Sequence, residues 1–154
     1  MLEPVIALDD PERDDVRELL ERHLAYANEC TPPGHVHALD VSALCTPDIL
    51  FFGCRDDGKL LAVGALRLID EHHGELKSMH TAAEARGRGI GTELVNSLID
   101  VARERGVTRL SLETGTMDAF APARALYLRM GFEECEPFGE YTNNPNSICM
   151  TRQI

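Results

Sequence analysis

The residues with the clearest chemical potential lie between Arg86 and Thr92, where the sequence reads RGRGIGT. Three glycines alternate here with two arginines and an isoleucine, directly before a run with helical periodicity. Glycine lets the backbone turn and come close to a ligand. The unpaired N–H groups of a first helical turn, together with the helix dipole, favour an anion at that place. The stretch therefore predicts a phosphate-binding turn.

The spacing of these residues distinguishes between the known phosphate-binding turns. A Walker loop has a lysine between its last glycine and a serine or threonine, whereas Thr92 follows Gly91 directly. A Rossmann turn needs G-x-G-x-x-G after a parallel strand, but these glycines alternate and the strands predicted before them are antiparallel. The pattern that the stretch does match is R-x-x-G-x-G, with Arg86, Gly89 and Gly91.

Seven strands and four helices are expected to position this turn. Strands are predicted over 4–8, 49–55, 60–69, 75–81, 107–114, 132–138 and 147–152. Helices are predicted over 11–28, 40–44, 90–106 and 121–130, the first with Asp10 as its N-cap and Pro11 at its first position. The long third helix joins two strands by short connections, which implies a parallel, right-handed crossover. We expect a single α/β domain over 1–154, a mixed sheet with helices on both faces.

Composition and charge narrow the classes of function. The chain of 154 residues carries a net charge of −11, which argues against general binding to nucleic acid or to an anionic membrane. No apolar run approaches the roughly 20 residues of a membrane span, and the acidic N-terminus lacks the shape of a signal peptide. The five cysteines contain no CxxC and are expected to be reduced. We therefore expect a cytoplasmic protein.

A second motif follows one crossover later. Ala125-Leu126-Tyr127 leads, after three residues, to Gly131-Phe132, and the helix is expected to turn Ala125, Leu126 and Met130 inward. Together with the R-x-x-G-x-G turn and the order of the elements, this segment resembles the GNAT superfamily of N-acetyltransferases over nearly the whole chain. The resemblance implies the GNAT acyl-CoA N-acyltransferase fold, a mostly antiparallel sheet with a central parallel crossover and splayed strands. It also implies direct transfer of an acetyl group from acetyl-CoA to a primary amine of a small molecule or peptide, without a metal.

The resemblance assigns the residues that bind acetyl-CoA. In the family the R-x-x-G-x-G turn holds the CoA pyrophosphate, and the strand before it pairs with the amides of the pantetheine arm. The matching positions in this chain are Met79, His80, Thr81, Arg86, Gly87, Arg88, Gly89, Ile90, Gly91 and Thr92. Many members place an asparagine seven residues before the catalytic tyrosine, whereas this chain has Phe120 there.

Several residues are candidates for the chemistry, because acetyl transfer must deprotonate an ammonium and protonate a leaving thiolate. Tyr127 matches the family's catalytic tyrosine and is the candidate acid; packing with a hydrogen bond to CoA is the simpler alternative. Glu75, eleven residues before Arg86, is the candidate base, and a solvated charge at a turn is its alternative. Glu113, inside an otherwise apolar strand, is the rival base. His80 is a further candidate, expected on the strand face opposite Glu75.

The acceptor side has fewer signals. His35 and His37 lie in the loop between the first two helices, where the family usually builds the acceptor pocket, and Tyr141 lies in a polar loop that would border the same pocket. Two histidines alone do not make a metal site. Two other functions stay open: a non-catalytic acyl-CoA-binding or regulatory module, and an interaction domain whose turn binds an unrelated anion. The family resemblance leaves a homodimer open as an assembly.

Overall fold

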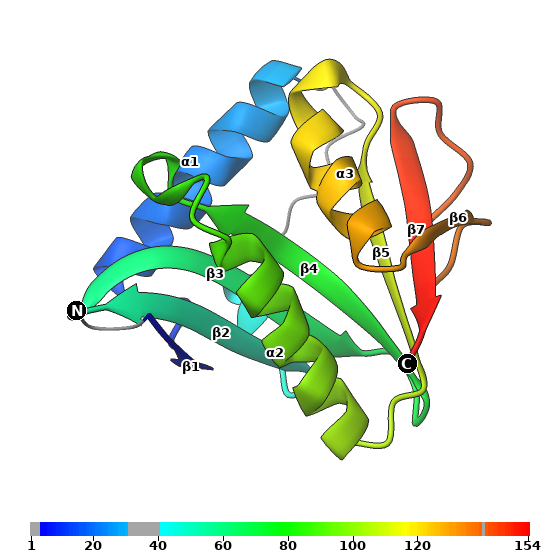
Figure 1. Ribbon diagram of the computed structural model, residues 1–154, viewed down its shortest axis with the longest axis horizontal. Coiled ribbons are helices and arrows are strands. Elements are labelled where there is room, and N and C mark those ends of the chain that lie inside the picture. Colours follow the sequence, from blue (N-terminus) through cyan, green and yellow to red (C-terminus); the bar gives the residue numbers. More distant parts are fainter. Residues whose placement is uncertain (1–3, 31–40, 140) are drawn as a thin grey trace.

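A seven-stranded mixed sheet forms the centre of the protein (Figure 1). The computed structural model describes residues 4–30, 41–139 and 141–154. Its strands are β1 (Val5–Leu8), β2 (Ile49–Asp56), β3 (Lys59–Leu68), β4 (His73–Thr81), β5 (Arg109–Gly115), β6 (Glu133–Cys135) and β7 (Ser147–Gln153). Within the described residues they lie in the order β1-β2-β3-β4-β5-β7-β6, and β4 and β5 form the one parallel pair. The predicted mixed sheet with a parallel crossover is confirmed.

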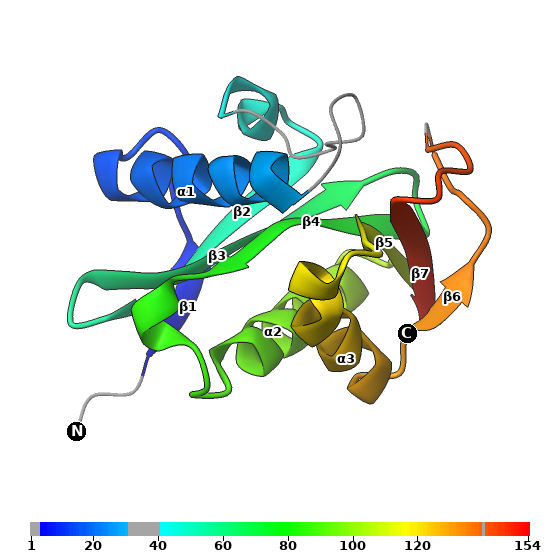
Figure 2. The same cartoon turned by 90° about the horizontal axis from the view of Figure 1, so that it is seen from above.

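Helices cover both faces of this sheet. They are α1 (Asp14–Cys30), α2 (Ile90–Glu104) and α3 (Ala121–Arg129), with short 3-10 turns η1 (Ser42–Cys45), η2 (Ala83–Ala85) and η3 (Asp118–Phe120). The helix α1 lies on one face, and α2 and α3 lie side by side on the other (Figure 2). Across the ranges described, no helix is both long and apolar enough to cross a membrane.

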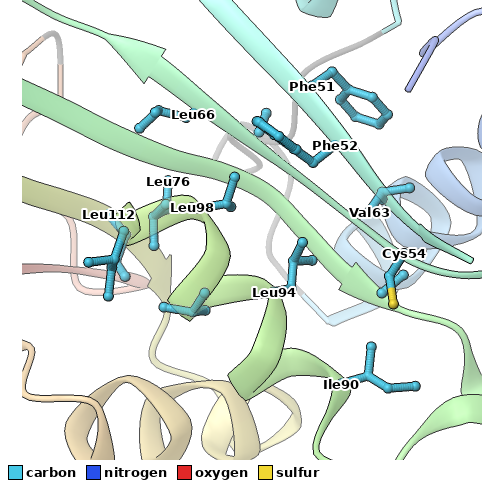
Figure 3. Packing of buried hydrophobic residues seen from close by; sticks show 14 of the residues in the cluster. Phe51, Phe52, Cys54, Val63, Leu66, Leu76, Ile90, Leu94, Leu98 and Leu112 are labelled. Atoms are coloured by element: carbon cyan, nitrogen blue, oxygen red, sulfur yellow. The ribbon is translucent and has the colours of Figure 1, made fainter. Parts of the chain in front are cut away.

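The helix α2 packs its apolar side onto the sheet (Figure 3). Ile90, Leu94 and Leu98 recur at helical spacing and are buried against strand side chains, among them Leu76 and Leu112. Burial of a leucine side chain contributes about 2 kcal/mol relative to its exposure. This packing therefore fixes the place where α2 begins, and with it the glycine-rich turn at its N-terminus.

The strand β4 is interrupted by a bulge and then separates from β5. Lys77 pairs with Ala65 of β3 and His80 pairs with Val63, so Ser78 and Met79 together oppose one residue of β3. Ser78 has a φ of 53° at this point. The parallel pairing between β4 and β5 ends at Leu76 and Leu112, although both strands continue beyond it. The splayed strands expected from the family resemblance are confirmed.

The bulge also decides which side chains share a face of the sheet. Residues directly opposite each other in neighbouring strands point to the same side. Glu75 is opposite Arg67 and His80 is opposite Val63, and these two β3 residues share a face because they are four positions apart in a regular strand. His80 therefore lies on the same face as Glu75. The expectation of opposite faces is wrong, because the inserted residue shifts the alternation by one.

Other differences concern the ends of elements. The helix α1 begins at Asp14 rather than Pro11, because the Asp10 carboxylate accepts a hydrogen bond from the Glu12 amide at 2.8 Å and holds a separate turn ahead of the helix. In α3, Ala125 is exposed and Tyr127 is the buried residue. The strand predicted over 132–138 is reduced to the three residues of β6. The short helix predicted over 40–44 is the 3-10 turn η1, and its expected cap at position 40 lies outside the described residues.

Candidate active site

A cavity of about 400 Å³ lies between the end of β4, the start of α2 and the helix α3. Nine of the ten residues expected to bind CoA line it; they are Met79, His80, Thr81, Arg86, Gly87, Gly89, Ile90, Gly91 and Thr92. Phe120 and Tyr127 line the same cavity from the side of α3. The structure therefore brings the phosphate-binding turn, the strand end and the candidate acid together.

Arg88 is the residue of this set that the structure places elsewhere. Its Nη2 lies 3.6 Å from Oδ2 of Asp56, at the end of β2. Arg86, two positions earlier, is exposed and lines the cavity. The two arginines of the turn thus have different surroundings, and Arg86 is the one placed to meet an anion there.

The N-terminus of α2 has the backbone geometry of an anion site. Gly89 is its N-cap with a φ of 76°, in the left-handed region that favours glycine, and no side-chain hydrogen bond caps the helix. The first N–H groups of a helix need a partner, and a phosphate can supply one. Gly91 approaches α3, since an added Cβ would lie 3.2 Å from Cδ2 of Leu126. Glycine is therefore favoured at position 89 by its conformation, and a side chain at position 91 would require Leu126 of α3 to shift.

Tyr127 is buried in the wall of the cavity, with 6% of its surface exposed. Its ring packs edge-on against Phe132, with the ring centroids 5.9 Å apart. Burial raises the pKa of the Tyr127 phenol to about 12, because the phenolate would lose its hydration. The phenol is therefore neutral at physiological pH and has a proton to donate.

Two contacts fix α3 at the end of β5. The Arg124 guanidinium donates from Nη1 to the carbonyl oxygens of Gly115, at 2.7 Å, and Met117, at 2.9 Å. The Phe120 ring lies so close to Gly115 that a side chain at this glycine would overlap it. Phe120 thus stands at the position where many family members have asparagine, and it lines the cavity with an aromatic ring in place of a side-chain amide.

A buried carboxylate lies on the other face of the sheet. Glu75 is 1% exposed. Its Oε2 accepts hydrogen bonds from the Tyr141 hydroxyl at 2.6 Å and from Lys77 Nζ at 3.1 Å. Its Oε1 lies 3.6 Å from Nη1 of Arg67 and accepts no hydrogen bond from the described residues. Two cations and a phenol therefore compensate the charge that burial would otherwise make costly.

Tyr141 completes this cluster from the loop before β7. Lys77 Nζ donates to its hydroxyl oxygen at 2.9 Å, and its ring packs against Phe138 with centroids 5.1 Å apart. Phe138 in turn packs against His73, at 5.8 Å between centroids. Burial and the neighbouring charge of Glu75 raise the pKa of the Tyr141 phenol far above its ordinary value of about 10. Tyr141 is thus held as a neutral phenol against Glu75.

A second polar chain crosses the same face, closer to the start of β4. His73 Nε2 lies 2.7 Å from Ser111 Oγ, and this hydroxyl lies 2.9 Å from Thr151 Oγ1. Arg109 Nη1 donates to the same threonine oxygen at 3.1 Å. Ser111 is directly opposite Glu75 in the parallel pair, so the two polar groups share one face of the sheet.

Glu113 lies two residues further along β5, past the last pair with β4. It is half-buried and directly opposite Cys149 of β7. Strand alternation places it on the face of Ser111 and Glu75. Both candidate bases are thus on the side of the sheet opposite α2 and α3, and Glu113 is the nearer of the two to the opening between the strands.

Comparison with known proteins shows the family of the chain. The model of the acetyltransferase (GNAT) family matches residues 14–132. The chain belongs to the GNAT family. The uncharacterized N-acetyltransferase YsnE of Bacillus subtilis is 40% identical over 149 residues, which are 97% of this chain and 99% of YsnE. The IAA acetyltransferase of Azospirillum brasilense is 36% identical over 150 residues, 97% of each chain.

Solved structures show the same GNAT fold. A protein of Klebsiella pneumoniae assigned as an acyl-CoA N-acyltransferase has a TM-score of 0.81 at 26% identity, and covers 97% of each chain. The PaiA N-acetyltransferase of Thermoplasma acidophilum in complex with coenzyme A has a TM-score of 0.76 at 14% identity, over 99% of this chain and all of that one. At the level of the family, this chain is an acetyltransferase that uses acetyl-CoA to acetylate amines.

The structure brings together more of the residues predicted for the donor side than of those predicted for the acceptor side. The predicted acid and nine of the predicted CoA residues share one cavity. Glu75 and Tyr141, predicted for different roles, are joined by a hydrogen bond. His35 and His37 lie outside the described residues, so their predicted place in the acceptor pocket stays a prediction.

Three residues of the site are not among those predicted from the sequence. They are Arg67, Lys77 and Phe138. The spacing of Lys77 from Glu75 did indicate a shared strand face, but it gave no reason to expect burial, and the lysine side chain is only 8% exposed. Arg67 stands near the end of an apolar strand, and a charged residue at such a position can indicate that it pairs with a buried charge. Phe138 falls in a segment that was expected to be a strand and gave no local signal.

Proposed function

We propose that this protein moves the acetyl group of acetyl-CoA directly to a primary amine of a small molecule or peptide. The observation that carries the proposal is the separation of β4 from β5 beyond Leu76 and Leu112. On one face this opening is bordered by the glycine-rich cavity with Tyr127, and on the other by the cluster around Glu75. A thioester held at the opening would have an acid on one side and a base on the other.

The donor would be held by the first face. The unpaired N–H groups at the start of α2 and the Arg86 guanidinium suit the pyrophosphate. The pantetheine amides suit the edge of β4 over 79–81, since this part of the strand no longer pairs with β5. The backbone amide near Met79, beside the bulge, is the group we assign to polarise the thioester carbonyl.

The chemistry needs one proton acceptor and one proton donor. Glu75 takes a proton from the acceptor ammonium, and the amine lone pair then forms a bond to the thioester carbon. When the carbon–sulfur bond breaks, the leaving thiolate takes its proton from Tyr127, whose raised pKa keeps that proton available at neutral pH. The nitrogen then releases its second proton to become an amide, and one proton returns to Tyr127, so the phenol is neutral again at the end of the reaction. Glu113 is the alternative base on the same face.

The acceptor would enter on the face of Glu75, beside Tyr141. His35 and His37, outside the described residues, stay candidates for contacting it. On this face the carboxylates of the two candidate bases, Glu75 and Glu113, would be separated by the sheet from the phosphates of the donor. We infer that the protein acts in the cytoplasm and needs no bound metal for this reaction. Its acidic surface, with a net charge of −11, suits a cationic amine.

A turnover screen tests the proposal. The enzyme is incubated with acetyl-CoA and free amino acids, polyamines, aminoglycosides and short peptides, while CoA thiol release and the mass of the acetylated amine are measured. We expect Tyr127→Phe to lower kcat by about a hundredfold and to leave the Kd for acetyl-CoA unchanged. Glu75→Gln and Glu113→Gln separate the two bases, because only the base variant should lose kcat to that extent.

Two results would support the other functions. Binding of acetyl-CoA without transfer to any amine or to water would indicate a non-catalytic acyl-CoA-binding module. An interaction domain would show no rise in melting temperature with CoA where sulfate gives one. Ligand binding at a hundredfold excess over Kd stabilises a fold by about 2.7 kcal/mol, so the thermal test is sensitive enough to decide.

A further inference from the structure

The carboxylate of Glu75 is covered on both of its oxygens. Arg67 lies beside Oε1, at 3.6 Å, and the Tyr141 hydroxyl and Lys77 Nζ bond to Oε2. With 1% of the residue exposed, an acceptor amine cannot touch the carboxylate while these groups stay in place. A base at this position therefore needs an intermediate group that reaches both the acceptor and Oε2.

We propose that Tyr141 is that group: a catalytic phenol that passes the acceptor's proton to Glu75. This inference rests on the proposed function, in which Glu75 is the base. Tyr141 is half-buried and comes from the loop before β7, whereas Glu75 itself is fully buried. Its hydroxyl already donates to Oε2 at 2.6 Å, so the second half of the path exists in the free protein.

The proton transfer balances in a single concerted step. An N–H bond of the acceptor ammonium breaks as an O–H bond forms to the phenol oxygen of Tyr141. The phenol's own O–H bond breaks at the same time, as an O–H bond forms to Oε2 of Glu75. The step begins with an ammonium and a carboxylate and ends with a neutral amine and a neutral carboxylic acid, while Tyr141 is a neutral phenol before and after.

The alternative carrier in the cluster is Lys77. Its Nζ lies 3.1 Å from Oε2 and 2.9 Å from the Tyr141 hydroxyl. A lysine that is ion-paired with Glu75 is an ammonium, so it has no lone pair to receive a proton until it has lost its own. It would also repel a cationic acceptor. Lys77 is better suited to hold the phenol and the carboxylate in place, as a positioning residue.

The charged groups around Tyr141 favour this relay. Arg67 from β3 and Lys77 from β4 face Glu75, and Glu113 from β5 adds a second negative charge near the phenol. Burial and these carboxylates keep the Tyr141 phenol protonated across the pH range of an enzyme assay. Tyr141 is therefore a neutral phenol in the assay, with its own proton already directed at Oε2 of Glu75.

A double-mutant cycle tests the relay. kcat is measured for the wild type, Tyr141→Phe, Glu75→Gln and the double variant, with the amine of greatest turnover in the screen above. Residues that act in one path are not additive. We expect each single variant to lose about a hundredfold in kcat and the double variant to lose no more than either one. Losses that multiply in the double variant would overturn the relay.

Further variants separate the relay from packing and from the proposed function. Tyr141→Leu removes the ring as well as the hydroxyl, so a relay predicts that Tyr141→Phe is as slow as Tyr141→Leu. If Tyr141→Phe keeps the wild-type kcat while Glu75→Gln loses it, the relay is wrong and the base assignment stands. If Glu75→Gln keeps the wild-type kcat, or no amine and not even water accepts the acetyl group, the base assignment and the relay both fail.

Discussion

The Tyr141 hydroxyl donates a hydrogen bond to Oε2 of Glu75 at 2.6 Å, although the two residues are 66 positions apart in the sequence. The bond joins the loop before β7 to the first part of β4. Lys77 bonds to both residues, so a carboxylate, an ammonium and a phenol form a closed triangle on the face of the sheet opposite α2 and α3. The donor cavity, with a neutral phenol of its own at Tyr127, lies across the sheet.

We predict that Lys77→Met destabilises the fold by about 3 kcal/mol. Removal of one partner of a buried ion pair leaves the other charge poorly compensated, and here Arg67, at 3.6 Å, is the remaining cation beside Glu75. Lys59→Met is the matched control, since this other lysine is exposed at the first position of β3 and should change stability by less than about 0.5 kcal/mol. Urea denaturation measures both. Equal stability of the two variants would show that the triangle contributes nothing to the fold.

The two arginines of the glycine-rich turn should differ in their effect on acetyl-CoA binding. Arg86→Ala removes a guanidinium from the cavity and is expected to weaken binding about tenfold, because hydrogen bonds to charged groups contribute roughly 1.5–3 kcal/mol. Arg88→Ala should change the affinity less than twofold, since Arg88 lies against Asp56. Isothermal titration calorimetry at fixed ionic strength separates the two. An equal loss in both variants would mean that Arg88 leaves Asp56 to contact the phosphates.

Arg124 is expected to hold α3, the helix that carries the proposed acid Tyr127, in place without lining the cavity itself. Its guanidinium bonds to the carbonyl oxygens of Gly115 and Met117, so Arg124→Ala leaves two acceptors without a charged donor. We predict a loss of about 2 kcal/mol in stability and a fall in kcat, because α3 carries Tyr127. The control is Arg103→Ala, which removes an exposed guanidinium from α2. Melting curves and kcat together test this, and a stable Arg124→Ala enzyme with full kcat would refute it.

The donor half of the site could be predicted from the sequence because its signals are local. Gly89 and Gly91 stand within three residues of one another and determine both the turn and the start of α2. Tyr127 is likewise fixed by its place in a short helix before Gly131. Residues that are close in the sequence stay close in the folded chain, so their spacing alone predicts that they lie together.

The acceptor half could not be predicted in the same way. Nothing near Glu75 indicates that a loop 66 positions later folds over it, and the burial of a charged strand residue depends on that loop. The face of His80 also depends on the bulge at Ser78, which has no turn residue such as glycine to reveal it. Counting alternate residues assumes an unbroken ladder, and one inserted residue reverses the result.

Alkaline unfolding gives a test of the buried phenols. The pKa of Tyr127 is about 12 in the folded protein and about 10 in the unfolded chain, so the unfolded state loses the proton first. The stability that the neutral phenol contributes is therefore complete below pH 10 and is lost as the pH rises toward 12. We expect the free energy of unfolding to fall by roughly 1 kcal/mol more in the wild type than in Tyr127→Phe between pH 8 and 11.

Tyr141→Phe should flatten the same part of the curve, because the pKa of Tyr141 is raised as well. Burial raises the pKa of the Cys149 thiol to about 11, so the stability that the neutral thiol contributes is lost as the pH rises above about 9. This thiol is present in the wild type and in both variants. Urea denaturation at steps of pH measures the differences, and the thiol's effect cancels between variants. Parallel curves for the wild type and both variants would show that neither phenol is buried as the structure has it.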